Sequence, residues 1–368
     1  MFPNKYAEVL TLLDRVDPVK YGATRNYLNG AVTRLSPYIS RGVISTRQVA
    51  QHMLRKGFQP YQIESFLKEL AWRDYFQQVW IARQDGIDRE LKQTQSNVMH
   101  HEIPSKLLVA NTGIHALDDG IQSLYDTGYM HNHMRMYTAS VACNIGQAHW
   151  RMPAQWMYFH LLDADWASNA LSWQWVAGSF SSKKYFCNQE NINKYTGSTQ
   201  RNTFLDLPYE ALPDLSVPEA LRETETINLQ TQLPVASAPV LDDALPIYIY
   251  NFYNLDPRWG SDLKAHRILL LEPSFFAKYP VCARTIDFII ALSNNIEGMQ
   301  VAVGEFSSVF AGVSTERLHF KEHPCNAHYQ GLEHPRDWMF PEVKGYYPSF
   351  FAFWKKAERR LTQLSDEL

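Results

Sequence analysis

The sequence has few cysteines, and their spacing excludes several classes of protein. Its 368 residues include only four, Cys143, Cys187, Cys282 and Cys325, and no two of them form a C-x-x-C pair. A small disulfide framework, a zinc ribbon and an iron–sulfur cluster all need cysteines at closer, repeated spacing. We expect four buried thiols.

Long apolar runs and common catalytic signatures are missing as well. No stretch approaches the length needed to cross a bilayer, and residues 1–16 lack a basic region followed by an apolar run and a cleavage site. We therefore expect a cytoplasmic protein with no membrane partner. The sequence has no P-loop, no dinucleotide fingerprint and no G-x-S-x-G turn, which argues against the commonest nucleotide-binding and serine hydrolase patterns.

Charge is divided unevenly although its sum is small. The net charge is −3, but residues 1–205 hold 21 Lys and Arg against 16 Asp and Glu, whereas residues 206–368 hold 14 against 22. A local excess of positive charge is expected where a protein meets a polyanion such as a nucleic acid. The first part of the chain is therefore the candidate nucleic-acid-binding part.

The patterning divides the chain into three parts and predicts a mainly α fold. Residues 1–205 have apolar residues at helical spacing and form the expected helical domain. Residues 206–245 are rich in proline and read as an extended connector. Residues 246–368 form the expected small α/β module. Short apolar runs predict strands at 246–256, 266–276 and 299–306. Longer runs with helical periodicity predict helices at 281–296 and 349–364.

Acids and indoles are crowded between residues 163 and 175, which read DADWASNALSWQW. A carboxylate removed from water needs a partner or a donor, and no Lys or Arg lies between Pro153 and Lys183. Any single tryptophan at helical spacing is explained by packing alone. The two acids, Asp163 and Asp165, therefore indicate a distant or bound partner.

Three other segments carry chemical groups at useful spacing. In residues 21–45, hydroxyls and free backbone N–H groups precede a proline and a helix, an arrangement that suits phosphate, although most such caps are structural. In residues 66–76, an acid, an indole and a guanidinium lie within one helical turn at Glu69, Trp72 and Arg73. Residues 129–144 read YMHNHMRMYTASVACN; its His131 and His133 are two apart and point away from each other on a helix, so we expect no metal site.

Taken together, these segments resemble the FAD-binding domain of the DNA photolyase and cryptochrome family over roughly residues 20–190. The patterns M-H-N-x-x-R-M, D-x-D and N-x-x-x-W-x-W occur in the family's order. The resemblance implies a helical bundle that holds FAD in a bent conformation. The residues that it assigns to the cofactor are Tyr21, Thr33, Arg34, Leu35 and Ser36 on the diphosphate side, Phe66, Arg73 and Asn132 in the cavity wall, and Asp163, Asp165, Arg135 and Asn169 near the flavin and ribityl, with Asn169 facing flavin N5.

The resemblance also implies an electron-transfer route through tryptophans. Trp173 is expected nearest the flavin and Trp150 next. The family usually has a third tryptophan, but residues 81–149 contain none. The sequence leaves Trp156, Tyr125 or Tyr129 as substitutes.

The function implied is light-driven repair of cyclobutane pyrimidine dimers, by electron transfer from an excited reduced flavin to a lesion flipped out of the DNA. The catalytic residues would be Glu69, Trp72, Met136, Asn169 and Trp175, and the DNA contacts would be Arg25, Glu69, Trp72, Asn132, His133 and Trp175. Asn132 and Met136 stand where enzymes for the (6-4) lesion carry histidines, which favours the cyclobutane dimer. His133 departs from the family's usual arginine. The small excess of positive charge in residues 1–205 favours single-stranded DNA as the substrate.

Other functions stay open at this stage. A blue-light photoreceptor of the cryptochrome kind would keep FAD and bind a signalling partner instead of repairing DNA, and a third class would use the flavin only as a structural element. We expect a monomer. Family members normally begin with an α/β domain that holds an antenna pigment, and we expect that this chain lacks it. The module at 246–368 would be its reduced or transposed counterpart, with a second chromophore undecided.

Overall fold

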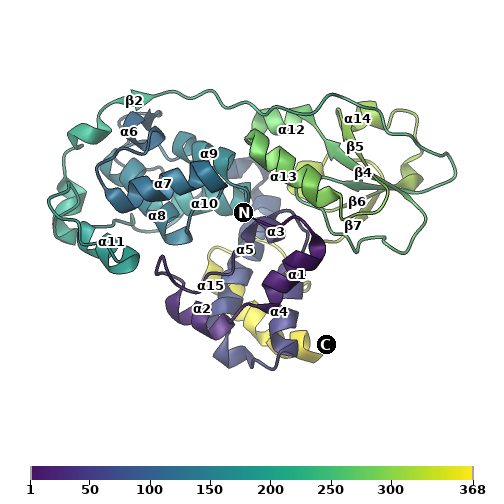
Figure 1. Ribbon diagram of the computed structural model, residues 1–368, viewed down its shortest axis with the longest axis horizontal. Helices are drawn as coiled ribbons and strands as arrows, with labels where there is room; N and C mark the ends of the chain where they lie inside the picture. The colour runs from purple at the N-terminus through teal and green to yellow at the C-terminus, as the bar shows by residue number, and fades with distance from the viewer. Residues whose placement is uncertain (1, 367–368) are drawn as a thin grey trace. The chain divides into compact units, whose positions relative to one another are not determined.

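The computed structural model describes residues 2–366, which fold into two compact units (Figure 1). Unit 1 comprises Met1–Gly22, Thr33–Ala82 and Gln230–Leu368, and unit 2 comprises Ala23–Val32 and Arg83–Leu229. The first helices of the chain therefore share a unit with the C-terminal module. This division differs from the expected one, in which a single helical domain ended at residue 205.

Unit 2 is helical, with one short two-stranded sheet. Its helices are α6 (Ser105–Leu108), α7 (His115–Thr127), α8 (Asn132–Ser140), α9 (Arg151–His160), α10 (Trp166–Ala177) and α11 (Gln189–Thr196), and β1 (Ile103–Pro104) pairs antiparallel with β2 (Thr224–Glu225). Both α7 and α10 end at a glycine in the left-handed conformation, Gly128 (φ 71°) and Gly178 (φ 80°). A residue with a side chain is strained in this conformation, so glycine ends these helices at low cost.

Unit 1 combines helices from both ends of the chain with a parallel sheet. Its helices are α1 (Tyr6–Asp14), α2 (Pro18–Thr24), α3 (Ser36–Ser40), α4 (Thr46–Arg55), α5 (Glu64–Arg83), α12 (Pro273–Lys278), α13 (Ala283–Ser293), α14 (Phe306–Val309), α15 (Phe350–Ala357) and α16 (Leu361–Asp366). Figure 1 shows the yellow C-terminal helix α15 among the purple N-terminal helices of the same unit. No helix within residues 2–366 is long and apolar enough to cross a membrane.

The sheet of unit 1 has five parallel strands in the order β5-β4-β3-β6-β7. They are β3 (Ile247–Tyr250), β4 (His266–Leu271), β5 (Met299–Val303), β6 (Leu318–Lys321) and β7 (Leu332–His334). The three predicted strands and the helix between them are present. The last two strands were not predicted. A mainly α fold with a small α/β module is thus confirmed.

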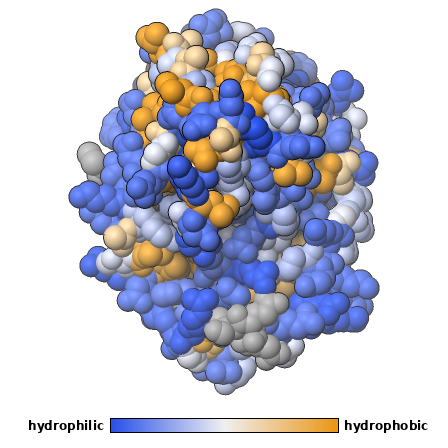
Figure 2. Space-filling view, turned by 90° about the vertical axis from the view of Figure 1, so that its right-hand side faces the viewer, coloured by the Kyte–Doolittle hydropathy of each residue, from blue (hydrophilic) through white to orange (hydrophobic). Residues whose placement is uncertain are grey.

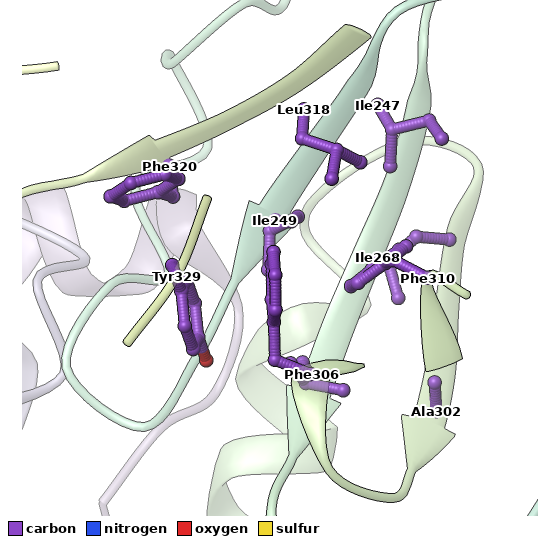
Figure 3. Packing of buried hydrophobic residues seen from close by; sticks show 10 residues of the cluster. Ile247, Ile249, Ile268, Ala302, Phe306, Phe310, Leu318, Phe320 and Tyr329 are labelled. Atoms are coloured by element: carbon purple, nitrogen blue, oxygen red, sulfur yellow. The ribbon is translucent and has the colours of Figure 1, made fainter. Parts of the chain in front are cut away.

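A continuous apolar core holds the sheet together, as Figure 3 shows. All four residues of β3 are buried, which is expected for a central strand of a parallel sheet covered on both faces. The core residues come from four strands, α14 and two loops, and they are Ile247, Ile249, Ile268, Leu270, Ala302, Phe306, Phe310, Leu318, Phe320 and Tyr329. In the view of Figure 2 the surface is mostly hydrophilic with scattered hydrophobic groups, which is ordinary for a folded protein.

The strand order reverses between β3 and β6, and open parallel sheets usually bind ligands at the carboxyl ends of such a pair. Here aromatic side chains fill that position. Tyr253, after β3, stacks on His323, after β6, with ring centroids 4.2 Å apart, and Trp80 of α5 packs edge-on against both. Helix α5 is thereby joined to the sheet.

A buried carboxylate on α5 ties the C-terminal segment to the N-terminal helices. Asp74 is 6% exposed; it accepts hydrogen bonds from the Thr46 hydroxyl and from the backbone N–H of Met339, each at 2.9 Å. Burial raises the pKa of Asp74 to about 6, because the loss of hydration outweighs the two hydrogen bonds that favour the ionised form.

We expect Asp74 to make stability depend on pH. The unfolded residue titrates near 3.8, so the folded chain binds the proton more tightly, and stability falls as pH rises through the window from 3.8 to about 6. Two pKa units correspond to roughly 3 kcal/mol. Asp74→Asn should remove this decline in urea unfolding measured across the window. Equal pH slopes for the variant and the parent protein would contradict the assignment.

Candidate functional site

Arg135 and Asp163 form a largely buried ion pair in unit 2. Arg135 lies on α8, and Asp163 lies in the turn between α9 and α10. The guanidinium donates to both carboxylate oxygens, at 3.1 and 2.9 Å, and its Nε donates to the Met130 carbonyl at 2.9 Å. Asp163 is 8% exposed, so the carboxylate depends on this partner for its stability. The distant cation that the sequence required for Asp163 is therefore Arg135.

The second acid and the amide lie in the first turn of α10. Asp165 is the N-cap, and its Oδ1 accepts from the Ser168 N–H at 2.7 Å. A cap of this kind contributes about 0.5–2 kcal/mol to stability. Asn169 is buried and donates from Nδ2 to the Ala154 carbonyl at 2.8 Å, which fixes its amide against α9. Asp165 has a structural role whether or not it also contacts a cofactor.

The tryptophans of unit 2 are buried, with one exception. Trp150 and Trp173 are 0% and 2% exposed, as expected for an internal route. Trp175 is 39% exposed, and its ring lies 5.8 Å from that of Tyr185. Trp175 is thus the indole of α10 that is open to an external partner.

Two of the three proposed substitutes for a third tryptophan, Trp156 and Tyr125, form a cluster of their own. The Trp156 indole N–H donates to the Tyr125 hydroxyl at 2.9 Å, and that hydroxyl donates to the Leu108 carbonyl at 2.6 Å. The rings of Trp156 and Tyr125 both pack against His160. Trp150 instead has Trp166 beside it, with ring centroids 6.5 Å apart.

The residues of unit 2 expected to meet DNA or the lesion differ in exposure: Asn132, His133 and Met136 lie on α8, and Arg25 lies in the turn after α2. Asn132 is exposed, and Arg25 and Met136 are half-buried. His133 donates from Nδ1 to the Asn26 carbonyl at 2.8 Å, and its ring lies 4.5 Å from the ring of Tyr137. Its second ring neighbour is Tyr195, at 4.6 Å. His133 is therefore packed within the fold, and burial lowers its pKa, so the ring is mainly neutral at neutral pH.

His131 is the N-cap of α8 and is 7% exposed. Burial, helped by the nearby charges of His133 and Arg135, lowers the pKa of His131 to about 4. It is neutral near pH 7, which limits the positive charge beside the Arg135–Asp163 pair.

Unit 1 holds the residues expected on the diphosphate side. Tyr21 packs edge-on against Phe66 with ring centroids 5.2 Å apart. The Thr33 hydroxyl accepts from the Leu35 N–H at 3.2 Å, and Arg34 between them has a φ of 54°, in the left-handed region. Ser36 then begins α3, a helix of about one and a half turns. The segment is a tight turn stabilised by its own hydroxyl.

The predicted acid, indole and guanidinium of α5 are also in unit 1. Arg73 donates to the Ser40 hydroxyl at 3.1 Å, which joins α5 to α3, and Glu69 is half-buried. The Trp72 ring stacks face to face on Phe350 of α15, with centroids 3.9 Å apart and an angle of 10° between the planes. One face of the indole is therefore covered. No feature of the local sequence around Trp72 indicated this partner.

The expected cofactor residues are divided between the two units. Tyr21, Phe66, Arg73 and the turn at 33–36 belong to unit 1, whereas Asn132, Arg135, Asp163, Asp165 and Asn169 belong to unit 2. Within unit 2 the structure brings Arg135 to Asp163. Within unit 1 it brings Tyr21 to Phe66.

Residues 66–204 match the family described as the FAD binding domain of DNA photolyase. A deoxyribodipyrimidine photo-lyase of Alkalihalophilus pseudofirmus is 35% identical over 161 residues, which are 43% of this chain and 34% of that protein. One from Halobacterium salinarum is 26% identical over 242 residues, which are 61% of this chain and 50% of that protein. The chain thus spans between a third and a half of the length of these two relatives.

Among solved structures, a cryptochrome from Synechocystis is similar with 24% identity and a TM-score of 0.46, covering 53% of this chain and 44% of that chain. An archaeal photolyase from Sulfolobus tokodaii, described as having two FAD molecules, has 26% identity and a TM-score of 0.43, covering 53% and 45%.

Proposed function

The chain belongs to the DNA photolyase and cryptochrome family through the FAD-binding domain at residues 66–204, and from this we propose that it repairs cyclobutane pyrimidine dimers in DNA with light. The observation that supports the proposal most directly is the buried Arg135–Asp163 pair beside the first turn of α10, inside that domain. Repair, the preference for single-stranded DNA and the roles of single residues are part of the proposal.

The residues present suit a flavin. When bound, FAD supplies light absorption and one-electron chemistry that no side chain provides. Asp163 and Arg135 would hold it in unit 2 as a pair of zero net charge, and Asn169 would add a neutral amide. This combination avoids a second negative charge near a reduced, anionic ring.

The lesion would be recognised by stacking and hydrogen bonding. Base stacking on an aromatic ring contributes about 1–3 kcal/mol per base, which offsets part of the cost of flipping a damaged nucleotide. Trp175 offers an exposed indole for this purpose. Glu69, in its protonated form, would donate a hydrogen bond to a thymine carbonyl. Met136 would pack on the lesion and Arg25 would reach a phosphate.

Blue light on a dimer-containing oligonucleotide tests the proposal. Restored thymines, measured by chromatography on single-stranded and duplex substrates in parallel, are the expected result. Unchanged lesions in both substrates, with FAD bound and reduced, would overturn it.

A second candidate function is a photoreceptor without repair, and the stack of Phe350 on Trp72 favours it. A helix that covers an indole needed for stacking is unfavourable for repair and compatible with signalling through α15. Unchanged lesions together with a flavin photocycle would indicate the receptor. Unchanged lesions without a photocycle would indicate a structural flavin.

Glu69→Ala should lower repair and leave flavin binding intact. A hydrogen bond from a neutral carboxyl to a carbonyl is worth about 0.5–1.5 kcal/mol, so we expect a loss of roughly two- to tenfold in repair rate at saturating light. Glu64→Ala is the matched control, because Glu64 lies on the same helix, is exposed and pairs with Lys68 at 2.7 Å. If the Glu69→Ala variant repairs dimers at the rate of the parent protein, Glu69 is not an active-site residue.

A further inference from the structure

Trp166 is a buried indole for which the family resemblance gave no role. It is the first residue of α10 and is 1% exposed. Its ring lies 6.5 Å from that of Trp150, centroid to centroid, at an angle of 33°. It also precedes Trp173 by seven residues, so the two indoles lie on the same face of α10, about two turns apart. Trp166 thus adjoins one expected member of the electron-transfer route and shares a helix face with the other.

The two neighbouring indoles differ in their hydrogen bonds. The Trp166 N–H donates to Oδ1 of Asp88 at 2.7 Å, and Asp88 is half-exposed at the end of a 3₁₀ turn, η2 (Gln84–Asp88). The buried Trp150 N–H has no acceptor among the residues that the structure describes. A positive charge on an indole makes its N–H more acidic, and a nearby carboxylate stabilises both the charge and the departing proton. A buried indole without an acceptor lacks this stabilisation.

We infer that Trp166 is the outer tryptophan of the electron-transfer route, in place of the one missing from residues 81–149, and that Asp88 accepts its proton. This inference rests on the proposed function, since FAD, when bound, would supply the light-driven oxidant that removes the first electron from the tryptophans. One electron passes from Trp166 to oxidised Trp150, which restores Trp150 and leaves Trp166 as a radical cation. The Nε1 proton then moves to Asp88, which leaves a neutral indolyl radical and a neutral carboxylic acid.

The geometry gives this route a direction. The charge is less stable on Trp150 and more stable on Trp166 beside the Asp88 carboxylate, so it is held at the outer position. Once the proton has moved, the electron can return only together with the proton. Because Asp88 is partly open to solvent, the proton can exchange with water, which lengthens the life of the separated charge.

The experiment compares Trp166→Phe with Trp156→Phe. Both indoles are 1% exposed and both N–H groups donate within unit 2, so the second variant is a matched control. The FAD-loaded protein without DNA is excited with blue light, and the tryptophan radical is followed by transient absorption and electron spin resonance. We expect Trp166→Phe to shorten the radical lifetime by about tenfold or more, and Trp156→Phe to leave it unchanged.

Asp88→Asn provides a second variant with a readout that needs no flavin. In the apoprotein, ultraviolet resonance Raman should show one indole N–H with a weaker hydrogen bond. In the loaded protein, the radical should keep the spectrum of the cation for longer, because the proton acceptor is gone. An unchanged radical lifetime in Trp166→Phe, or no long-lived tryptophan radical in the parent protein, would overturn the inference.

Failure of the proposed function has a different signature. With flavin reduced chemically beforehand, Trp166→Phe should repair dimers at the rate of the parent protein, because the route is then not needed. If the parent protein repairs nothing but the radical behaves as expected, repair is refuted and the role of Trp166 stands.

Discussion

Phe350→Ala is expected to raise affinity for a dimer-containing oligonucleotide by about tenfold, because a flipped base and the Phe350 ring compete for one face of Trp72. The two rings are stacked 3.9 Å apart at 10°, and Phe350 is 2% exposed. A base on this face of Trp72 must therefore displace Phe350, and about 1–3 kcal/mol of stacking is lost in the exchange. Removing the ring removes that competition.

The adjacent residue supplies the control. Phe351 lies on the same helix, α15, but is 71% exposed, so Phe351→Ala should leave DNA affinity unchanged. Truncating Phe350 leaves a cavity and costs about 3–5 kcal/mol of stability, so circular dichroism must accompany the binding measurement. Phe350→Leu, which keeps most of the volume but loses the flat ring, should show the same direction with less loss of stability. Unchanged affinity in both Phe350 variants would mean that lesions do not use this face of Trp72.

Asp163→Ala is expected to abolish flavin binding, with a loss of more than about a hundredfold in affinity. The substitution leaves the Arg135 guanidinium, which is 21% exposed, without its carboxylate partner. Breaking a buried pair costs about 3–5 kcal/mol, because the remaining charge is uncompensated. The measurement is the FAD absorbance that stays with the protein after gel filtration.

Two controls separate cofactor loss from unfolding. Asp206→Ala breaks an exposed pair with Arg201 in the same unit, which is worth about 1 kcal/mol or less, and should keep the flavin. Asp163→Asn keeps the shape of the side chain and removes its charge. Partial retention of the flavin by this variant would assign the loss of flavin affinity to the missing charge. Full flavin occupancy in Asp163→Ala would show that the flavin is not held by the Arg135–Asp163 pair, contrary to our proposal.

The sequence predicted elements whose pattern is strong and local. The apolar runs at β3, β4 and β5 and the helical period at α13 were recognised because each element is buried on most of its surface. Strand β7 has three residues that are exposed or half-exposed, so no apolar pattern marks it. Strand β6 alternates buried and half-buried positions over only four residues. Such short strands depend on pairing with a neighbour, which periodicity does not report.

Long-range contacts account for the other features that the sequence did not predict. Periodicity identified α5 but not its partners, and its contact from Asp74 to Met339 joins residues 265 positions apart. At the site, the two acids without a local cation predicted a distant or bound partner, and the family resemblance placed Arg135 near them. The Phe350–Trp72 stack had no comparable signal. The pairing of Trp166 with Asp88 had no sequence signal either.

Unit 1 is built from three separate stretches of the chain, and this has a consequence during protein synthesis. Helix α5 leaves the ribosome long before residues 339–350, yet its bonds to Met339 and Gly345 and its stack on Phe350 need those residues. All segments of unit 2 are translated before residue 230, so that unit can fold on the nascent chain while the first helices wait. The waiting helices expose apolar faces for most of translation, and a chaperone that covers such faces should raise the yield of folded protein.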